Sequence, residues 1–398
     1  MTRTGFAETD YELELIDERT DHYFAATKLI VETFGDVWVT YAVFLRRPVI
    51  SAPRLVLEWL DQLTNYGRAQ SRTPRVVCGV EQPSKNYFEI EVLKPEGTLV
   101  GAGEPILYVS GMFSDLVQLE TIILQKLGSA CVAAYNAYQM CLSLPKVKFI
   151  DMAARHCSGR EMQHAMAYGA AVGSRRAQDK GAVGFIGGSV DETAFEFGQG
   201  GGLGTMPHAL IGYAGSTLAA VGMYIKTFPT NPITVLPDYF GREVTDMLEV
   251  CRTYHLLAEA GSLSVRLDTH GGRYMEGLDT ASSYAVLERH VPNAIRQYRS
   301  QEELQILIGT GVSAAAIWFM REKLDDEGFV NVQIVGSSGF DVTKCRVMAE
   351  ASAPIDVIGT GSFIPDSWKE TYATADIIEY EGRPSVKVGR EFLLRKSE

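Results

Sequence analysis

Residues 332–362 read VQIVGSSGFDVTKCRVMAEASAPIDVIGTGS, and this stretch decides the class of fold. It begins with a short apolar run that ends in GSSG at 336–339, continues with helix-like sequence, and finishes with a second apolar run that ends in GTGS at 359–362. A short buried strand, a turn of small residues and a helix together form the repeating unit of a parallel α/β sheet. The stretch therefore predicts parallel strands joined by helices.

The same rhythm begins upstream, at about residue 146. Eight short apolar runs end in small or polar residues: KVKFIDM (146–152), AVGFIGG (182–188), GLGTMPH (202–208), ITVLPD (233–238), SVRLDTH (264–270), LQILIGTG (304–311), VQIVGSSG (332–339) and DVIGTGS (356–362). Helix-like sequence separates most of them, so we expect an irregular, TIM-like α/β barrel. The irregularity is expected at the second and third runs, because the ETAFEFGQG between them is short for a crossover helix.

The two ends of the chain have other patterns. Residues 1–135 mix helix-like stretches such as TDHYFAATKLIVETF with strand-like ones such as VWVTYAVFL, which is typical of an α+β domain. Residues 371–398 return to strand-like alternation around the turn signal EGRP. A closed barrel cannot take another strand, so we expect this tail to rejoin the N-terminal sheet, leaving 136–370 as the barrel.

The composition excludes several classes of function and location. The net charge of −12 argues against a nucleic-acid partner, because that role needs a basic face. The six cysteines form no C-x-x-C pair, which favours reduced thiols. The acidic N-terminus has no apolar signal region, and the sequence has no uncharged apolar run of membrane-spanning length. We therefore expect a cytoplasmic protein that acts on small molecules and does not bind membranes.

Candidate site residues follow the apolar runs. In an α/β barrel the active site lies at the C-terminal ends of the strands, and phosphate commonly binds after strands seven and eight. The predicted phosphate-binding residues are Ser337, Ser338, Gly339, Gly359, Thr360 and Gly361. The polar residues that follow or end the other runs are Arg155, His156, His208, Asp238, Arg266, Asp268 and His270. Cations beside acids suit an anionic substrate with hydroxyl groups, whereas a Schiff-base aldolase would need a lysine, which ends none of the runs.

Three motifs point to a known family. GTMPH at 204–208 looks like a G-T-M-x-H segment, RLDT at 266–269 like an R-x-D-S segment, and TDHY at 20–23 like a T-D-x-Y segment. They occur in the order in which the nicotinate phosphoribosyltransferase family has them. The sequence thus resembles this family of type II phosphoribosyltransferases, which is related to the nicotinamide and quinolinate phosphoribosyltransferases.

The resemblance implies a fold and a reaction. The fold would be an N-terminal α+β sandwich, completed by the C-terminal strands, and an irregular barrel. The reaction would transfer phosphoribose from phosphoribosyl pyrophosphate to nicotinate, with Mg²⁺ and coupled to ATP hydrolysis, and give nicotinate mononucleotide in NAD synthesis. By resemblance His208 is the phosphoryl carrier, Arg266 and Asp268 hold the ribose phosphate or the base region, and Thr205 contacts substrate. Tyr23 would stack on the pyridine ring from a neighbouring subunit, which implies a homodimer or a larger homo-oligomer.

Two departures keep alternatives open. The family's first barrel strand usually ends F-G-x-R-R, whereas this chain has Met152-Ala153-Ala154-Arg155-His156, so Arg155 alone is matched to the carboxylate or phosphate. Asp191 lies one position later than the family's acidic residue. Quinolinate without ATP is the second choice of substrate, and another pyridine base the third. A phosphate-binding isomerase or lyase would need a proton-abstracting pair that we do not find, and a non-catalytic ligand-binding barrel is the remaining alternative.

Overall fold

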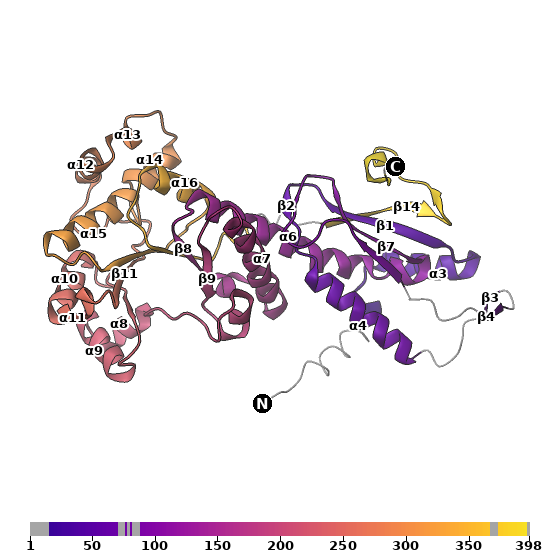
Figure 1. The fold of residues 1–398 in the computed structure, drawn as a ribbon, viewed down its shortest axis with the longest axis horizontal. Helices are drawn as coiled ribbons and strands as arrows, with labels where there is room; N and C mark the ends of the chain where they lie inside the picture. Colours follow the sequence, from indigo (N-terminus) through magenta and orange to yellow (C-terminus); the bar gives the residue numbers. More distant parts are fainter. Residues whose placement is uncertain (1–15, 71–75, 78–79, 82–87, 367–372, 396–398) are drawn as a thin grey trace. The chain divides into compact units, whose positions relative to one another are not determined.

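The computed structural model describes residues 16–70, 76–77, 80–81, 88–366 and 373–395 (Figure 1). The N-terminal segment 1–15, on which the export prediction depends, lies outside the described residues. The chain divides into unit 1, residues 1–135 with 367–398, and unit 2, residues 136–366.

Unit 1 is built on an antiparallel sheet of five strands in the order β15-β14-β1-β7-β5. Their bounds are β1 Trp38–Leu45, β5 Phe88–Val92, β7 Pro105–Met112, β14 Ala373–Tyr380 and β15 Arg383–Pro384. The C-terminal strand β14 pairs with β1 along its length, from Val39 opposite Tyr380 to Leu45 opposite Ala373. Segments from the two ends of the chain therefore form one sheet.

Two short strand pairs and several helices complete unit 1. The pairs are β2 Val49–Ile50 with β6 Leu99–Val100, and β3 Val76–Val77 with β4 Val80–Glu81. The helices are α2 Ile16–Arg19, α3 His22–Phe34, α4 Arg54–Gln70, α5 Phe113–Val117, α6 Glu120–Ser143, which continues into unit 2, and the 3₁₀ turn η4 Glu391–Leu393. Phe44 and Tyr108 pack on Leu393 on one face of the sheet, where the Tyr108 hydroxyl donates to the Leu393 carbonyl at 3.0 Å.

Unit 2 contains a parallel sheet of six strands in the order β10-β11-β12-β13-β8-β9. Their bounds are β8 Lys148–Asp151, β9 Gly184–Gly188, β10 Ile233–Val235, β11 Leu263–Leu267, β12 Gln333–Gly336 and β13 Val357–Thr360. Arg266 of β11 lies opposite Val335 of β12, which lies opposite Val357 of β13. Because all six strands run the same way, their C-terminal ends share one edge of the sheet.

Helices follow the strands of unit 2 (Figure 1). They are α7 Arg160–Gln178, α8 His208–Ala214, α9 Thr217–Thr227, α10 Glu243–Thr253, α11 His255–Glu259, α12 Thr280–His290, α13 Pro292–Ile295, α14 Gln301–Ile308, α15 Ala314–Asp326 and α16 Val342–Glu350, with 3₁₀ turns η1 Ala153–His156 and η2 Asp191–Phe197. Every residue of β13 is buried, as are three of the four in β12, which is expected when a parallel sheet is covered on both faces.

Two of the eight predicted strands are wrong. The run 304–311 lies largely in helix α14, which begins with a capping box in which Ser300 and Glu303 bond each other's backbone. The run 202–208 forms no strand, because Leu203 makes a single backbone bond to Gly188 and the chain then leads into Pro207, which has no N–H to donate. Within residues 136–366 the sheet ends at β10 and β9, so closure into a barrel stays a prediction.

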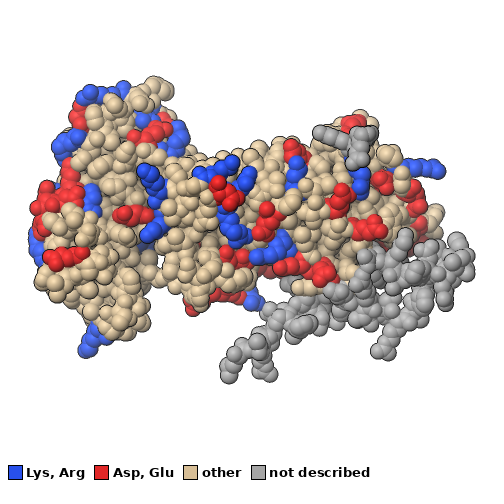
Figure 2. Space-filling model, viewed as in Figure 1, with Lys and Arg blue, Asp and Glu red and all other residues tan. Residues whose placement is uncertain are grey.

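Three general properties of the chain can be compared with the structure. None of the described helices is both long and apolar enough to cross a membrane. The described cysteines, Cys131, Cys141, Cys157, Cys251 and Cys345, are free thiols. On the face seen in Figure 2, basic and acidic side chains are interspersed.

Candidate active site

Arg266, near the C-terminal end of β11, is at the centre of a polar cluster. Its guanidinium donates to the Ser337 hydroxyl at 2.9 Å, to the Thr205 hydroxyl at 2.8 Å and to the Asp268 carboxylate at 2.9 Å. Only 11% of the Arg266 side chain is exposed. An arginine this deeply buried needs its charge balanced, which Asp268 does here. The structure thus brings together four predicted site residues from three segments that are far apart in the sequence.

Ser337 links this cluster to the first of the two glycine-rich loops. Its backbone N–H donates to the Leu267 carbonyl at 3.0 Å, and its hydroxyl donates to Asp268 at 2.9 Å. The two residues that follow, Ser338 and Gly339, have φ values of 75° and 67°. Left-handed backbone is unusual for serine and costs about 1 kcal/mol or more, so the surrounding contacts must hold it in place.

The second glycine-rich loop is connected to the first. The buried hydroxyl of Thr360, at the end of β13, donates to the Phe340 carbonyl at 3.0 Å. A Cβ atom on Gly361 would lie 2.7 Å from the Met152 carbonyl and 2.9 Å from the His156 ring. One on Gly359 would lie 2.7 Å from the Met152 side chain. These glycines therefore let the chain after β8 approach the chain after β13.

His208 and Asp238 form a second pair beyond the sheet. Nε2 of His208, the first residue of α8, lies 2.9 Å from Oδ1 of Asp238, and 44% of the histidine side chain is exposed. Burial raises the pKa of Asp238 above its ordinary value, which the neighbouring His208 only partly offsets. Arg273 donates to the Asp238 carbonyl at 3.0 Å and pairs with the fully buried Glu243 at 2.6 Å. The backbone of Asp238, whose carboxylate bonds His208, is thus itself anchored.

The remaining predicted residues lie in three places. Arg155 is exposed in the turn after β8. The pKa of the neighbouring His156 is lowered, first by partial burial of the histidine and then by the charge of Arg155. Asp191, in the turn after β9, accepts from the Gly202 amide at 2.7 Å and so ties down the segment that leads to Thr205. Tyr23 belongs to unit 1, on α3, where 62% of it is exposed and its hydroxyl donates to Asp21 at 3.2 Å.

Two residues with perturbed ionisation were missed by the sequence analysis. Asp151 is buried at the end of β8, where burial raises its pKa to about 6 although it accepts from the Ala153 amide at 2.8 Å. Lys344 lies in the first turn of α16, where burial lowers its pKa to about 8. A lysine there opposes the helix dipole, which favours anions at a helix N-terminus. Its position in the sequence, five residues after the GSSG loop and in the first turn of the following helix, was the signal that could have identified it.

Mg²⁺, which the resemblance implies, usually binds one or two carboxylates together with substrate phosphates. Asp238 and Asp268 fit this role, since they follow the paired parallel strands β10 and β11 at the same edge of the sheet. Among the described residues, no group of three or more His, Cys, Asp or Glu side chains could hold a metal by itself. An ion here would therefore need oxygens from the substrate.

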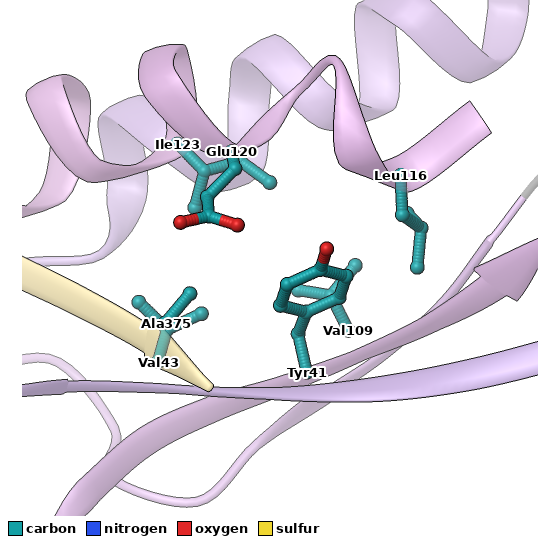
Figure 3. A pocket seen from close by; sticks show the side chains of 7 residues that line it. All are labelled: Tyr41, Val43, Val109, Leu116, Glu120, Ile123 and Ala375. Carbon is teal, nitrogen blue, oxygen red and sulfur yellow. The ribbon is translucent and has the colours of Figure 1, made fainter. Parts of the chain in front are cut away.

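Unit 1 has a cavity of its own between the sheet and the helices α5 and α6 (Figure 3). Its lining residues are Tyr41, Val43, Val109, Leu116, Glu120, Ile123 and Ala375. The carboxylate of Glu120 and the hydroxyl of Tyr41 both point into this otherwise apolar space (Figure 3). Burial raises the pKa of Glu120 to about 7, with smaller contributions from the charges of Asp376 and Asp21.

Comparison with known proteins gives a fold. Residues 62–131 match the family model described as quinolinate phosphoribosyl transferase, N-terminal domain. A search of curated proteins found no match. Among solved structures, nicotinate-nucleotide pyrophosphorylase from Pyrococcus furiosus is 22% identical with a TM-score of 0.69, covering 98% of this chain and 81% of that one.

Two further solved structures have a similar fold. Human nicotinic acid phosphoribosyltransferase is 17% identical with a TM-score of 0.59, covering 92% of this chain and 75% of that one. Nicotinate-nucleotide pyrophosphorylase from Ehrlichia chaffeensis is 13% identical with a TM-score of 0.55, covering 94% and 100%. The chain therefore has the fold that these enzymes share.

Proposed function

We propose that this protein is a phosphoribosyltransferase of NAD synthesis that joins phosphoribose to a pyridine carboxylate. The supporting observation is the cluster of Arg266, Asp268, Ser337 and Thr205 at the C-terminal edge of the parallel sheet, beside two glycine-rich loops. Phosphate and sugar hydroxyls need backbone amides, a cation and a carboxylate at one place, and this edge supplies all three. The shared fold of the pyrophosphorylase and phosphoribosyltransferase structures supports the same assignment.

The proposed chemistry needs no nucleophilic side chain for the transfer. The pyridine nitrogen attacks C1 of the ribose, a C–N bond forms, and the C–O bond to pyrophosphate breaks. The protein positions the reactants and stabilises developing charge. Ser337, Ser338, Gly339, Gly359, Thr360 and Gly361 would hold the 5′-phosphate, Asp268 the ribose hydroxyls, and Arg155 with Asp191 the substrate's other polar groups. Mg²⁺, held by Asp238 and Asp268, would neutralise charge on the departing pyrophosphate.

Nicotinate is the proposed base, and the supporting observation is the pair formed by His208 and Asp238. A partly exposed imidazole with one nitrogen on a carboxylate leaves its other nitrogen available to attack the γ-phosphorus of ATP, with ADP leaving. Such a carrier couples ATP hydrolysis to transfer. Quinolinate is the second candidate, favoured by the family model that matches residues 62–131.

We also propose a homo-oligomer in which Tyr23 contacts the site of a second copy. The helix α3 exposes Tyr23, Leu29, Ile30 and Phe34 by 57% to 87%, which is unusual for large apolar side chains in such number. Activity regained on mixing Tyr23→Ala with an Asp268→Asn protein would support shared sites, because each hybrid contains one intact site. A fully active monomer in sedimentation would contradict them.

The function is tested by pyrophosphate release from phosphoribosyl pyrophosphate. Nicotinate, nicotinamide and quinolinate are offered separately, each with and without ATP. We expect release with nicotinate and stimulation by ATP. Release with quinolinate alone, independent of ATP and accompanied by CO₂, would select the second candidate. No release with any base, under conditions in which ribose 5-phosphate binds, would reject the proposed reaction.

A further inference from the structure

Lys344 contacts the strained residue of the GSSG loop. Its ammonium donates to the carbonyl of Ser338 at 2.7 Å and lies 4.4 Å from the centre of the Phe340 ring. The Phe340 ring is fully buried and packs against Gly336, where a Cβ would lie 2.9 Å from it. The lysine stem is thus held against a fixed ring, and its ammonium reaches back over one helical turn to the loop.

This bond determines the direction of an amide. In a trans peptide, the carbonyl of one residue and the N–H of the next point in opposite directions, and the structure has no cis peptide among its described residues. Fixing the Ser338 carbonyl on Lys344 therefore fixes the Gly339 N–H on the other side. Within residues 136–366, the amides of Ser338 and Gly339 donate to no backbone carbonyl, so both are suited to an anion.

Other contacts fix the loop on either side of that peptide. Ser337 is bonded to β11 and Phe340 to Thr360. Lys344 bonds the Ser338 carbonyl between them, at a residue whose left-handed φ of 75° is unfavourable for serine. Without that bond, the Ser338–Gly339 peptide could rotate and turn a carbonyl toward the place where the anion binds.

We propose that Lys344 is a positioning residue of the phosphate loop: by holding the Ser338 carbonyl, it keeps the Gly339 N–H directed at the 5′-phosphate of the ribose substrate. This inference rests on the proposed function. The charges of three groups act on the pKa of the ammonium: Asp341 and Cys345 at the start of α16, and Asp268 after β11. The two carboxylates favour the charged lysine, while burial opposes it more strongly and brings its pKa to about 8. The Cys345 thiol stays neutral, because burial raises its pKa well above the ordinary range.

The test compares how tightly wild type, Lys344→Met and Lys344→Arg bind ribose 5-phosphate. Calorimetry measures this affinity without turnover. Lys323→Met is a matched control, since Lys323 also lies over a phenylalanine four residues before it, Phe319, but donates to no loop carbonyl in the described structure. We expect Lys344→Met to weaken binding about tenfold, which is the usual effect of losing one charge-assisted hydrogen bond. Lys344→Arg should weaken binding less, and Lys323→Met should leave it unchanged.

A second measurement separates this role from a general effect on folding. The phosphate is already dianionic above about pH 7. Wild-type affinity should therefore fall between about pH 7 and about pH 9 as Lys344 loses its proton, whereas Lys344→Arg should stay flat. This comparison remains available if Lys344→Met does not fold.

Three results would each overturn the inference. Wild type and Lys344→Met bind ribose 5-phosphate equally well, wild type and Lys344→Arg show the same dependence of affinity on pH, or wild type does not bind ribose 5-phosphate at all. A wild type that releases pyrophosphate while Lys344→Met binds normally would overturn the inference alone. A tenfold binding loss in Lys344→Met with no pyrophosphate release from wild type would overturn the proposed reaction alone.

Discussion

Replacing Glu120 with glutamine should change how the stability of unit 1 depends on pH. Glu120 lines the apolar cavity of Figure 3, where its pKa rises from the ordinary 4.5 to about 7. The folded protein therefore keeps a proton that the unfolded chain loses as pH rises through 4.5. Unfolding then releases a proton, so the free energy of unfolding falls with rising pH until Glu120 itself ionises, near pH 7.

The pKa values set the size of this effect. A rise from 4.5 to about 7, at about 1.4 kcal/mol per pH unit, gives a loss of about 3 kcal/mol across that window. Because Glu120 is only partly buried, this figure is an upper limit. Glutamine is neutral at every pH and can still accept from the Tyr41 hydroxyl. Glu120→Gln should therefore match wild type below about pH 4.5 and exceed its stability by up to about 3 kcal/mol near pH 8.

Urea unfolding followed by tryptophan fluorescence measures this difference. Three of the four tryptophans lie in unit 1, so a Trp318→Phe background confines the signal to that unit. Glu89→Gln, which removes an exposed carboxylate on β5, is the control and should follow wild type. If Glu120→Gln and wild type run parallel from about pH 5 to about pH 8.5, the cavity does not hold a protonated carboxyl and the reasoning is refuted.

Three further predictions concern unit 2. His208→Ala should abolish ATP stimulation and leave a slow ATP-independent transfer; equal stimulation of both proteins by ATP in the pyrophosphate assay would remove His208 from the coupling. Arg266→Lys should lower kcat/KM at least about a hundredfold, because lysine cannot span the three partners of the guanidinium, and steady-state kinetics within tenfold of wild type would disprove this. Gly361→Ala should cost about 1–3 kcal/mol and weaken ribose 5-phosphate binding, since its Cβ would meet the Met152 carbonyl, whereas Gly200→Ala, which has open space, should do neither in thermal melts and calorimetry.

The sequence predicted the parallel sheet where strands are short, apolar and followed by small residues. Six of the eight runs are strands, and the GSSG and GTGS stretches follow neighbouring strands, β12 and β13. The prediction of a strand at 304–311 was wrong because short apolar runs look alike in buried strands and buried helices. The capping box at Ser300 and Glu303 was the signal that distinguishes the two, since it marks the beginning of a helix.

The pairing of the C-terminal strands with the N-terminal sheet was predicted, but side-chain contacts between distant segments were not. Glu120 and Tyr41 lie on different elements, and nothing in their local sequence indicates that they share a cavity. The bond of Arg266 to Thr205 likewise depends on how the segment after β9 folds back, which Asp191 helps to fix. The motif resemblance identified Arg266 and Thr205 as site residues, but it did not predict the hydrogen bond between them.

The Arg266 cluster also changes how its role in binding should be understood. Of the five N–H groups on a guanidinium, at least three already bond Ser337, Thr205 and Asp268. Its charge is balanced by Asp268, so it adds little net positive charge for an anion. Arg266 therefore acts chiefly by fixing the relative positions of three segments, those after β9, β11 and β12. If the proposed function holds, recognition of phosphate falls to the backbone amides that these segments orient, and loops of glycine and serine, without lysine or arginine, suit that role.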